Sequence, residues 1–239
     1  MFNKQLVVLI NGPINSGKDT LGELLAIELV RLGIDTKLSM FKEELYTMAS
    51  KISSIPRDEF VRQASDRFDK EEPWYKLPQN SATGLYFTPR QWLIHVSENV
   101  LKPLVGKTVF GKSALQNTID PFFETYKSGV VIMTDCGFTD EVDEVRKVYK
   151  EITEKTIFEQ KNTILVRITR PGTSFANDSR NWIDNPDYTI DNRGTLEDLE
   201  DSAKALALML KVILGKGDVQ DNLAISMELM KQAQGLMND

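Results

Sequence analysis

Short runs of apolar residues alternate along the chain with longer stretches in which apolar residues recur at helical spacing. The run at residues 6–10 is continuous and rich in β-branched residues, which is typical of a strand buried on both faces of a sheet. Runs of the same kind at 129–135 and 163–168 predict two more buried strands, and shorter ones at 36–41 and 188–191 predict two further strands. The pattern therefore predicts strands that are separated by helical segments.

Two of the predicted helices carry clear start signals. Thr88 precedes Pro89, and Thr195 is followed three residues later by Asp198, so each threonine is expected to cap the first turn of a helix. Strands that alternate with helices imply a mainly parallel sheet with helices on both faces, an α/β fold of three α/β/α layers. Ligands of such sheets bind at the carboxyl ends of the strands.

The segment between the first predicted strand and the first predicted helix reads G-x-x-x-x-G-K over residues 12–18. Gly12 and Gly17 allow the backbone to turn tightly, so that successive backbone N–H groups point inward at an anion. The positive N-terminal end of the helix and the charge of Lys18 add to this attraction. Because a strand before the motif and a helix after it are the required context, we interpret it as the phosphate-binding loop of a P-loop NTPase rather than a glycine turn beside a surface lysine.

The residue after Lys18 departs from the usual pattern. A Ser or Thr hydroxyl that ligates magnesium normally follows the lysine, whereas this chain has Asp19 and then Thr20. Asp19 could hold magnesium directly or through water, or Thr20 could stand in for the usual hydroxyl. Alternatively, Asp19 only lies in the first turn of the helix, where a negative charge is favourable.

Composition excludes several other classes of protein. The 239 residues are 41% hydrophobic and 27% charged, and the net charge is −6 without a dense Lys/Arg cluster, which argues against a nucleic-acid polymer as partner. Cys136 is the one cysteine and His95 the one histidine, so a disulfide framework is excluded and a His/Cys metal site or a Ser-His-Asp triad is disfavoured. The apolar stretch near the N-terminus is too short for a signal peptide or a membrane span, so a cytoplasmic protein is expected.

The Ser-Gly-Lys-Asp-Thr sequence at residues 16–20 resembles the variant loop of the bacteriophage deoxynucleoside monophosphate kinases, within the nucleoside monophosphate kinase group. Further matches follow in the same order up to about Leu214: Phe41-Lys42, Thr88-Pro89-Arg90-Gln91, Asp135 with Glu141, Arg170-Pro171-Gly172, and Asp191-Asn192 with residues 194–199. The resemblance implies transfer of the ATP γ-phosphate to a (deoxy)nucleoside monophosphate, with Mg²⁺ as cofactor. The chain departs from the family at Gly137, where an arginine is frequent; either another arginine replaces it or the acceptor site differs.

Candidate site residues follow from the loop, the strand ends and the resemblance. The residues expected to contact ATP are Gly12, Asn15, Ser16, Gly17, Lys18, Asp19, Thr20, Arg170, Arg180 and Asn192. Those expected to contact the acceptor are Lys42, Arg67, Arg90 and Trp92. Those expected to act in catalysis are Lys18, Asp135, Arg90 and Arg170, and those expected to hold the metal are Asp19, Thr20 and Asp135.

Some of these residues also have an ordinary structural interpretation. Asn192 could stabilise an Asn-x-Gly turn instead of contacting the base of ATP, Trp92 could pack in a core, and Arg67 could be a solvated charge on a helix. Asp135 could cap the turn after its strand. A functional role is favoured for Asp135, because the carboxyl ends of parallel strands would bring it close to Lys18.

Residues 1–239 are expected to form a single P-loop kinase domain. It would include a helical acceptor-binding region over about 43–127, in which a second helix covers 57–70, a lid-like loop over about 170–186, and an amphipathic helical extension over about 218–239. The extension would pack on the domain or form a subunit interface, so a homodimer is one option. Two alternatives stay open: another small-molecule kinase, of the dephospho-coenzyme A or phosphomevalonate kinase type, and a non-catalytic nucleotide-binding protein. A phage-encoded enzyme would work in the host cytoplasm.

Overall fold

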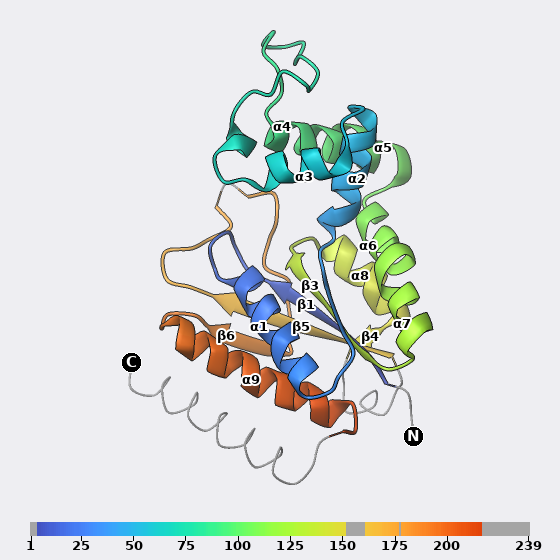
Figure 1. The fold of residues 1–239 in the computed structure, drawn as a ribbon, viewed down its shortest axis with the longest axis vertical. Helices are drawn as coiled ribbons and strands as arrows, with labels where there is room; N and C mark the ends of the chain where they lie inside the picture. The colour runs from blue at the N-terminus through green and yellow to red at the C-terminus, as the bar shows by residue number, and fades with distance from the viewer. Residues whose placement is uncertain (1–3, 152–160, 177, 217–239) are drawn as a thin grey trace. The chain divides into compact units, whose positions relative to one another are not determined.

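The computed structural model describes residues 4–151, 161–176 and 178–216 (Figure 1). The amphipathic helix that the sequence predicts near the C-terminus lies outside these residues, so its packing and the homodimer stay predictions. The chain divides into two compact units. The sheet unit comprises Met1–Met40 and Leu115–Asp239, and the helical unit comprises Phe41–Ala114.

Within the described residues of the sheet unit, six strands form one sheet, and all their pairings are parallel. They are β1 (Gln5–Asn11), β2 (Thr36–Ser39), β3 (Gly129–Cys136), β4 (Lys150–Glu151), β5 (Lys161–Thr169) and β6 (Tyr188–Asp191). The strand order is β2-β3-β1-β5-β4, and β6 also pairs with β5. The carboxyl ends of β1, β3 and β5 therefore lie next to one another at one edge, as binding at strand ends requires.

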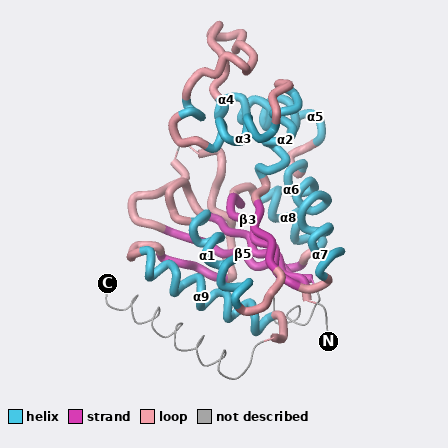
Figure 2. The backbone as a smooth tube through the Cα atoms, in the orientation of Figure 1, coloured by secondary structure: helices cyan, strands magenta, loops and turns pink. Residues whose placement is uncertain are grey.

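Helices cover both faces of this sheet. On one face lie α1 (Lys18–Arg31) and α9 (Leu196–Ile213), which pack against each other; on the other lie α7 (Asp120–Tyr126) and α8 (Thr139–Val148) (Figure 2). A π-helical turn, η3 (Leu115–Ile119), precedes α7. The three-layer α/β/α P-loop fold predicted from the sequence is confirmed.

Alternation along β1 explains why its apolar run is continuous. Leu6, Val8 and Ile10 belong to the core cluster that α1 and α9 complete, while Val7 and Leu9 point to the opposite face. All five side chains are fully buried. A strand with helices on both faces has no polar side, so it reads as an unbroken apolar run.

A glycine sets how closely α1 approaches the sheet. A Cβ atom on Gly22 would lie 2.3 Å from Cγ2 of Thr134 on β3. The helix can therefore start directly over the strand ends. Gly22, in the second turn of α1, therefore lies against Thr134, near the carboxyl end of β3.

The helical unit is built from short helices. They are α2 (Lys42–Ile52), α3 (Arg57–Ser65), the 3-10 turn η1 (Asp69–Glu71), α4 (Pro89–Ile94), the π-helical η2 (His95–Leu101), α5 (Lys102–Val105) and α6 (Val109–Ala114). Their core contains Tyr46, Phe60, Trp74 and Trp92, with the rings of Phe60 and Trp74 6.2 Å apart.

The structure confirms the two predicted helix caps, but the helix predicted over 57–70 is shorter than expected. Thr88 and Thr195 each form a capping box with the residue three positions later. The helix predicted over 57–70 ends at Ser65, because Asp66 is extended and its Oδ1 accepts hydrogen bonds from the backbone N–H groups of Phe68 and Asp69, at 2.7 and 2.9 Å. A carboxylate that satisfies local backbone donors in this way competes with the helix.

Candidate functional site

The phosphate loop, residues 12–17, connects β1 to α1, and two glycines allow its path. Gly17 precedes the helix with φ 95°, a left-handed conformation that glycine adopts without strain. A Cβ on Gly12 would lie 2.8 Å from the carbonyl oxygen of Ile168 and 2.6 Å from Oγ of Ser16. Both glycines are therefore required by the geometry, as expected of a loop that cradles an anion.

Asn192 supports this loop from a distant part of the sequence. Its Nδ2 donates a 2.8 Å hydrogen bond to the carbonyl oxygen of Ser16, and its backbone N–H bonds Thr169 O at the end of β5. The side chain is 8% exposed and its Nδ2 would be 2.4 Å from a Cβ on Gly17. Asn192 thus holds the loop backbone in place; contact with ATP stays a prediction.

Ser16 presents a buried hydroxyl inside the loop. Its side chain is fully buried, and among the described residues its Oγ has no hydrogen-bond partner. A buried polar atom without a partner costs free energy, about 1–3 kcal/mol. Such a group fits a loop that is completed by a polar ligand.

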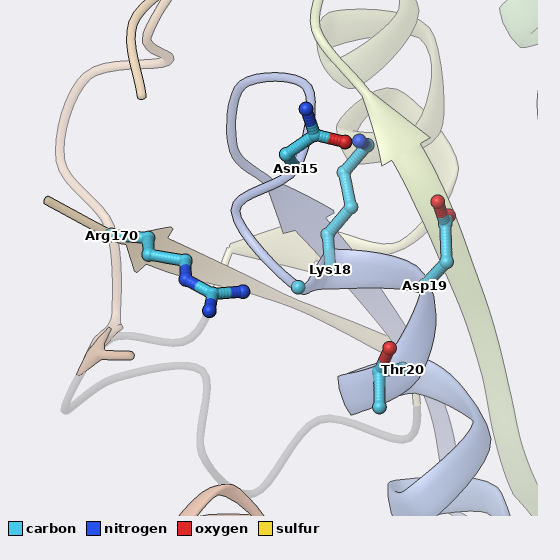
Figure 3. A pocket seen from close by; sticks show the side chains of 6 residues that line it. Asn15, Lys18, Asp19, Thr20 and Arg170 are labelled. Atoms are coloured by element: carbon cyan, nitrogen blue, oxygen red, sulfur yellow. The ribbon is translucent and has the colours of Figure 1, made fainter. Parts of the chain in front are cut away.

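Lys18 begins α1 and folds back over the loop. Its side chain is 7% exposed, and Nζ lies 3.3 Å from the carbonyl oxygen of Pro13. Figure 3 shows the amine beside Asn15, at the mouth of the loop. The lysine charge and the N-terminal end of the 14-residue helix therefore act on the same space.

A cavity of about 270 Å³ opens at the start of α1. It is lined by Asn15, Gly17, Lys18, Asp19, Thr20 and Arg170. Arg170 follows β5 directly, and its guanidinium points toward the loop (Figure 3). Two cationic side chains and a helix N-terminus around one cavity favour a polyanionic ligand, and six of the ten residues predicted to bind ATP line it.

Two more charged site residues, Asp135 and Arg180, lie outside the lining of this cavity. Asp135 lies at the carboxyl end of β3 and is 8% exposed. Burial lowers the pKa of Arg180, but the hydrogen bonds and charge of Asp178, together with the charges of Asp135 and Asp19, more than offset this and raise that pKa above its ordinary value. The charges of Arg180, Asp135 and Asp19 therefore interact. The structure brings these predicted site residues together.

Asp178 forms a two-pronged ion pair with Arg180. Nε of Arg180 lies 3.0 Å from Oδ1 of Asp178, and Nη2 lies 2.6 Å from Oδ2. Burial raises the pKa of Asp178, but the hydrogen bonds and charge of Arg180 and the charge of Lys18 outweigh it, so the pKa is lowered. Asp178 was not predicted from the sequence as a site residue. The signal that could have revealed it is its position two residues before the candidate Arg180.

Asn11 is a second residue that the sequence analysis missed. It ends β1, is fully buried, and its Nδ2 donates hydrogen bonds to the carbonyl oxygens of Cys136 and Asn181, both at 3.0 Å. Its Oδ1 accepts one from the N–H of Ile183, at 3.1 Å. A polar residue directly after a buried apolar strand was the signal that could have revealed it.

The four predicted acceptor residues belong to the helical unit. Arg90 pairs with Glu71 at 2.6 Å, Lys42 lies over the ring of Tyr46, and Arg67 is exposed. Trp92 is 5% exposed and donates its indole N–H to Ala49 O at 3.1 Å, so it packs in the core of that unit. Stacking of Trp92 on a base would require this core to open, and all four acceptor roles stay predictions.

A magnesium ion at this site would need oxygen atoms of the bound ligand and of water, besides those of the protein, to complete its coordination. Within the described residues, no group of three or more His, Cys, Asp or Glu side chains lies close enough to hold a metal. Mg²⁺ usually binds through one or two carboxylates plus phosphate oxygens and waters. Asp19 and Thr20, which line the cavity, and Asp135, at the carboxyl end of β3, fit that donor set, because they supply carboxylate and hydroxyl oxygens.

Comparison with known proteins finds similarity among solved structures. No family model matches the sequence, and no curated protein matches it. A hexameric APS kinase from Thiobacillus denitrificans is similar with a TM-score of 0.42 and 16% identity, over 91% of this chain and 30% of that chain. The chain thus spans less than a third of the length of that protein, and a likeness at this level assigns neither a family nor a substrate. In the described ranges, no helix has the length and apolar content needed to cross a membrane.

Proposed function

We propose that this protein is an ATP-dependent phosphotransferase whose acceptor is a (deoxy)nucleoside monophosphate. The observation that carries the proposal is the cavity at the start of α1, where the phosphate loop, Lys18 and Arg170 surround a space at the carboxyl ends of parallel strands. This is the arrangement in which P-loop proteins bind nucleotide phosphates. The acceptor class rests on the sequence resemblance alone.

The residues of the cavity can perform phosphoryl transfer without a covalent enzyme intermediate. Lys18 and Arg170 would neutralise charge on the oxygens of the transferring phosphate, and the loop N–H groups would hold the phosphates that leave. Asp135 could accept a hydrogen bond or a proton from the acceptor phosphate. Mg²⁺, held by oxygens of Asp19, Thr20 or Asp135, would supply additional positive charge when bound.

The test is an ATP-coupled assay of the purified chain against a panel of dNMPs and NMPs. We expect formation of the diphosphate of at least one acceptor, and loss of at least about a hundredfold in kcat for Lys18→Ala, because one preorganised donor at a developing charge contributes about that much. Lys204→Ala is the matched control, since Lys204 is a half-exposed lysine on α9 paired with Asp201. Equal activity of the Lys18→Ala and Lys204→Ala variants would contradict the proposal.

The same panel separates two other candidates. Transfer to a non-nucleotide alcohol or phosphate acceptor, with none to any NMP, would indicate another small-molecule kinase on the same fold. Tight ATP binding without transfer to any acceptor would indicate a nucleotide-binding protein that is not an enzyme. The replacement of the usual Ser/Thr by Asp19 is the specific observation that favours this last candidate.

A further inference from the structure

The side chain of Arg180 lies over a residue that has no side chain. A Cβ on Gly137 would come within 2.6 Å of Cδ and Cγ and 2.7 Å of Cβ of Arg180. Gly137 is not in the left-handed region, so its backbone would accept alanine without strain. The side chain of Arg180 therefore occupies the space over Gly137, and this packing accounts for a glycine at this position.

The backbone next to Arg180 is fixed to the ends of two core strands. The N–H of Asn181 donates to the carbonyl oxygen of Gly137 at 3.0 Å, just beyond β3. Asn11, at the end of β1, bonds both Asn181 and Ile183 through its buried amide. This end of the segment predicted to be a lid is thus anchored on the sheet by three hydrogen bonds.

Arg180 lies close to the start of the phosphate loop, because Asn11, which bonds the neighbouring residue Asn181, directly precedes that loop. It is paired with Asp178, which interacts with the charge of Lys18, and it interacts with the charges of Asp135 and Asp19. Its side chain is 20% exposed, so part of it remains accessible to a ligand. An arginine fork with an accessible edge can bind a phosphate oxygen while Asp178 keeps it oriented.

We propose that Gly137 and Asn11 are positioning residues that hold the Arg180 guanidinium beside the phosphate cavity, where it contacts a phosphate of the bound nucleotide. This inference rests on the proposed function, because it assumes that the cavity takes a nucleoside triphosphate. Gly137 is then needed because any side chain there would clash with the Cβ, Cγ and Cδ atoms of Arg180 and move its whole side chain.

The test is a double-mutant cycle with Gly137→Ala and Arg180→Ala. We expect each single variant to lose about tenfold or more in kcat/KM and in ATP affinity, measured by titration calorimetry, since a hydrogen bond to a charged group contributes at least this much. If alanine at 137 acts by displacing Arg180, the double variant loses no more than about threefold beyond Arg180→Ala alone. A hundredfold, additive loss in the double variant, or a silent Gly137→Ala, would overturn the proposal.

Controls distinguish positioning from loss of folding. Arg31→Ala removes a more exposed arginine with a comparable short-range ion pair, to Glu28 on α1, and should leave ATP affinity within twofold. The melting temperatures of all variants are also compared. If Gly137 has a structural role that does not involve Arg180, Gly137→Ala lowers the melting temperature by the same amount in the wild-type and in the Arg180→Ala background. Asn11→Asp keeps the size and the Oδ1 acceptor but loses the Nδ2 donors, and its loss in ATP affinity should likewise be non-additive with Arg180→Ala.

The affinity measurement separates this inference from the proposed function. Wild-type protein that binds ATP but phosphorylates no acceptor would refute the kinase proposal, yet non-additive losses of ATP affinity would still support the positioning of Arg180. Active wild-type protein with additive losses would support the kinase and refute the positioning. Absence of ATP binding by the wild-type protein would refute both.

Discussion

The hydrogen bond from Asn192 to Ser16 gives a prediction whose size can be worked out. Asn192→Ala removes the 2.8 Å bond and leaves the carbonyl oxygen of Ser16 in a buried place without its donor. A buried polar group that loses its partner costs about 1–3 kcal/mol. In a chain of this size, such a loss lowers the melting temperature by about 2–12 °C.

Loss of this bond should also weaken ATP binding. In Asn192→Ala, the bound ligand would have to order the loop. Part of the same 1–3 kcal/mol is therefore lost from the binding free energy, and we expect about tenfold weaker ATP affinity. Asn99→Ala is the control, because its exposed amide bonds the ring of His95, far from the loop in the sequence. Thermal unfolding and calorimetric titration measure both effects. An unchanged melting temperature together with ATP affinity within twofold would refute the supporting role of Asn192.

Two further predictions concern charge at the site. Asp19→Asn should raise the Mg²⁺ concentration for half-maximal activity by about tenfold, because a carboxylate offers the metal a charge that a hydroxyl lacks. The isosteric Thr20→Val should change that concentration by less than twofold. The reverse order of effects would show that Thr20 is the ligand. The pKa of Asp178 is lowered in the folded protein, so its stabilising effect is present above its unfolded pKa of about 3.9 and is lost as the pH falls through the folded pKa. The melting temperature of Asp178→Asn should therefore fall less steeply than that of the wild type below about pH 4, and parallel pH profiles would contradict the assigned pairing with Arg180.

The parts of the fold that were predictable from sequence are those set by local pattern. β1, β3 and β5 are each centred on a short apolar run, because helices cover both faces of the sheet. The phosphate loop follows from glycine chemistry within a few residues, and the capping boxes at Thr88 and Thr195 are complete within four. Strand β4 was not predicted, since two residues are too few to form a pattern.

The supporting parts of the site were not predictable, because they join segments that are far apart in the chain. The bond from Asn192 to Ser16 spans 176 residues, and the bond from Asn11 to Asn181 spans 170. The sequence shows an Asn-x-Gly turn and a polar residue after a strand, but neither pattern says which backbone group the amide will reach. Likewise, the sequence analysis registered Gly137 as a missing side chain, whereas the structure shows which side chain takes its space.

The central claim is that the loop and Lys18 bind the phosphates of ATP for transfer to a nucleoside monophosphate. Following radiolabel from γ-labelled ATP into a panel of dNMPs and NMPs tests it most directly, with wild-type, Lys18→Ala and Lys204→Ala proteins side by side. The account predicts a labelled diphosphate with the wild-type and Lys204→Ala proteins and at least a hundredfold slower labelling with Lys18→Ala. No labelled diphosphate from any acceptor, or labelling that does not depend on Lys18, would contradict it.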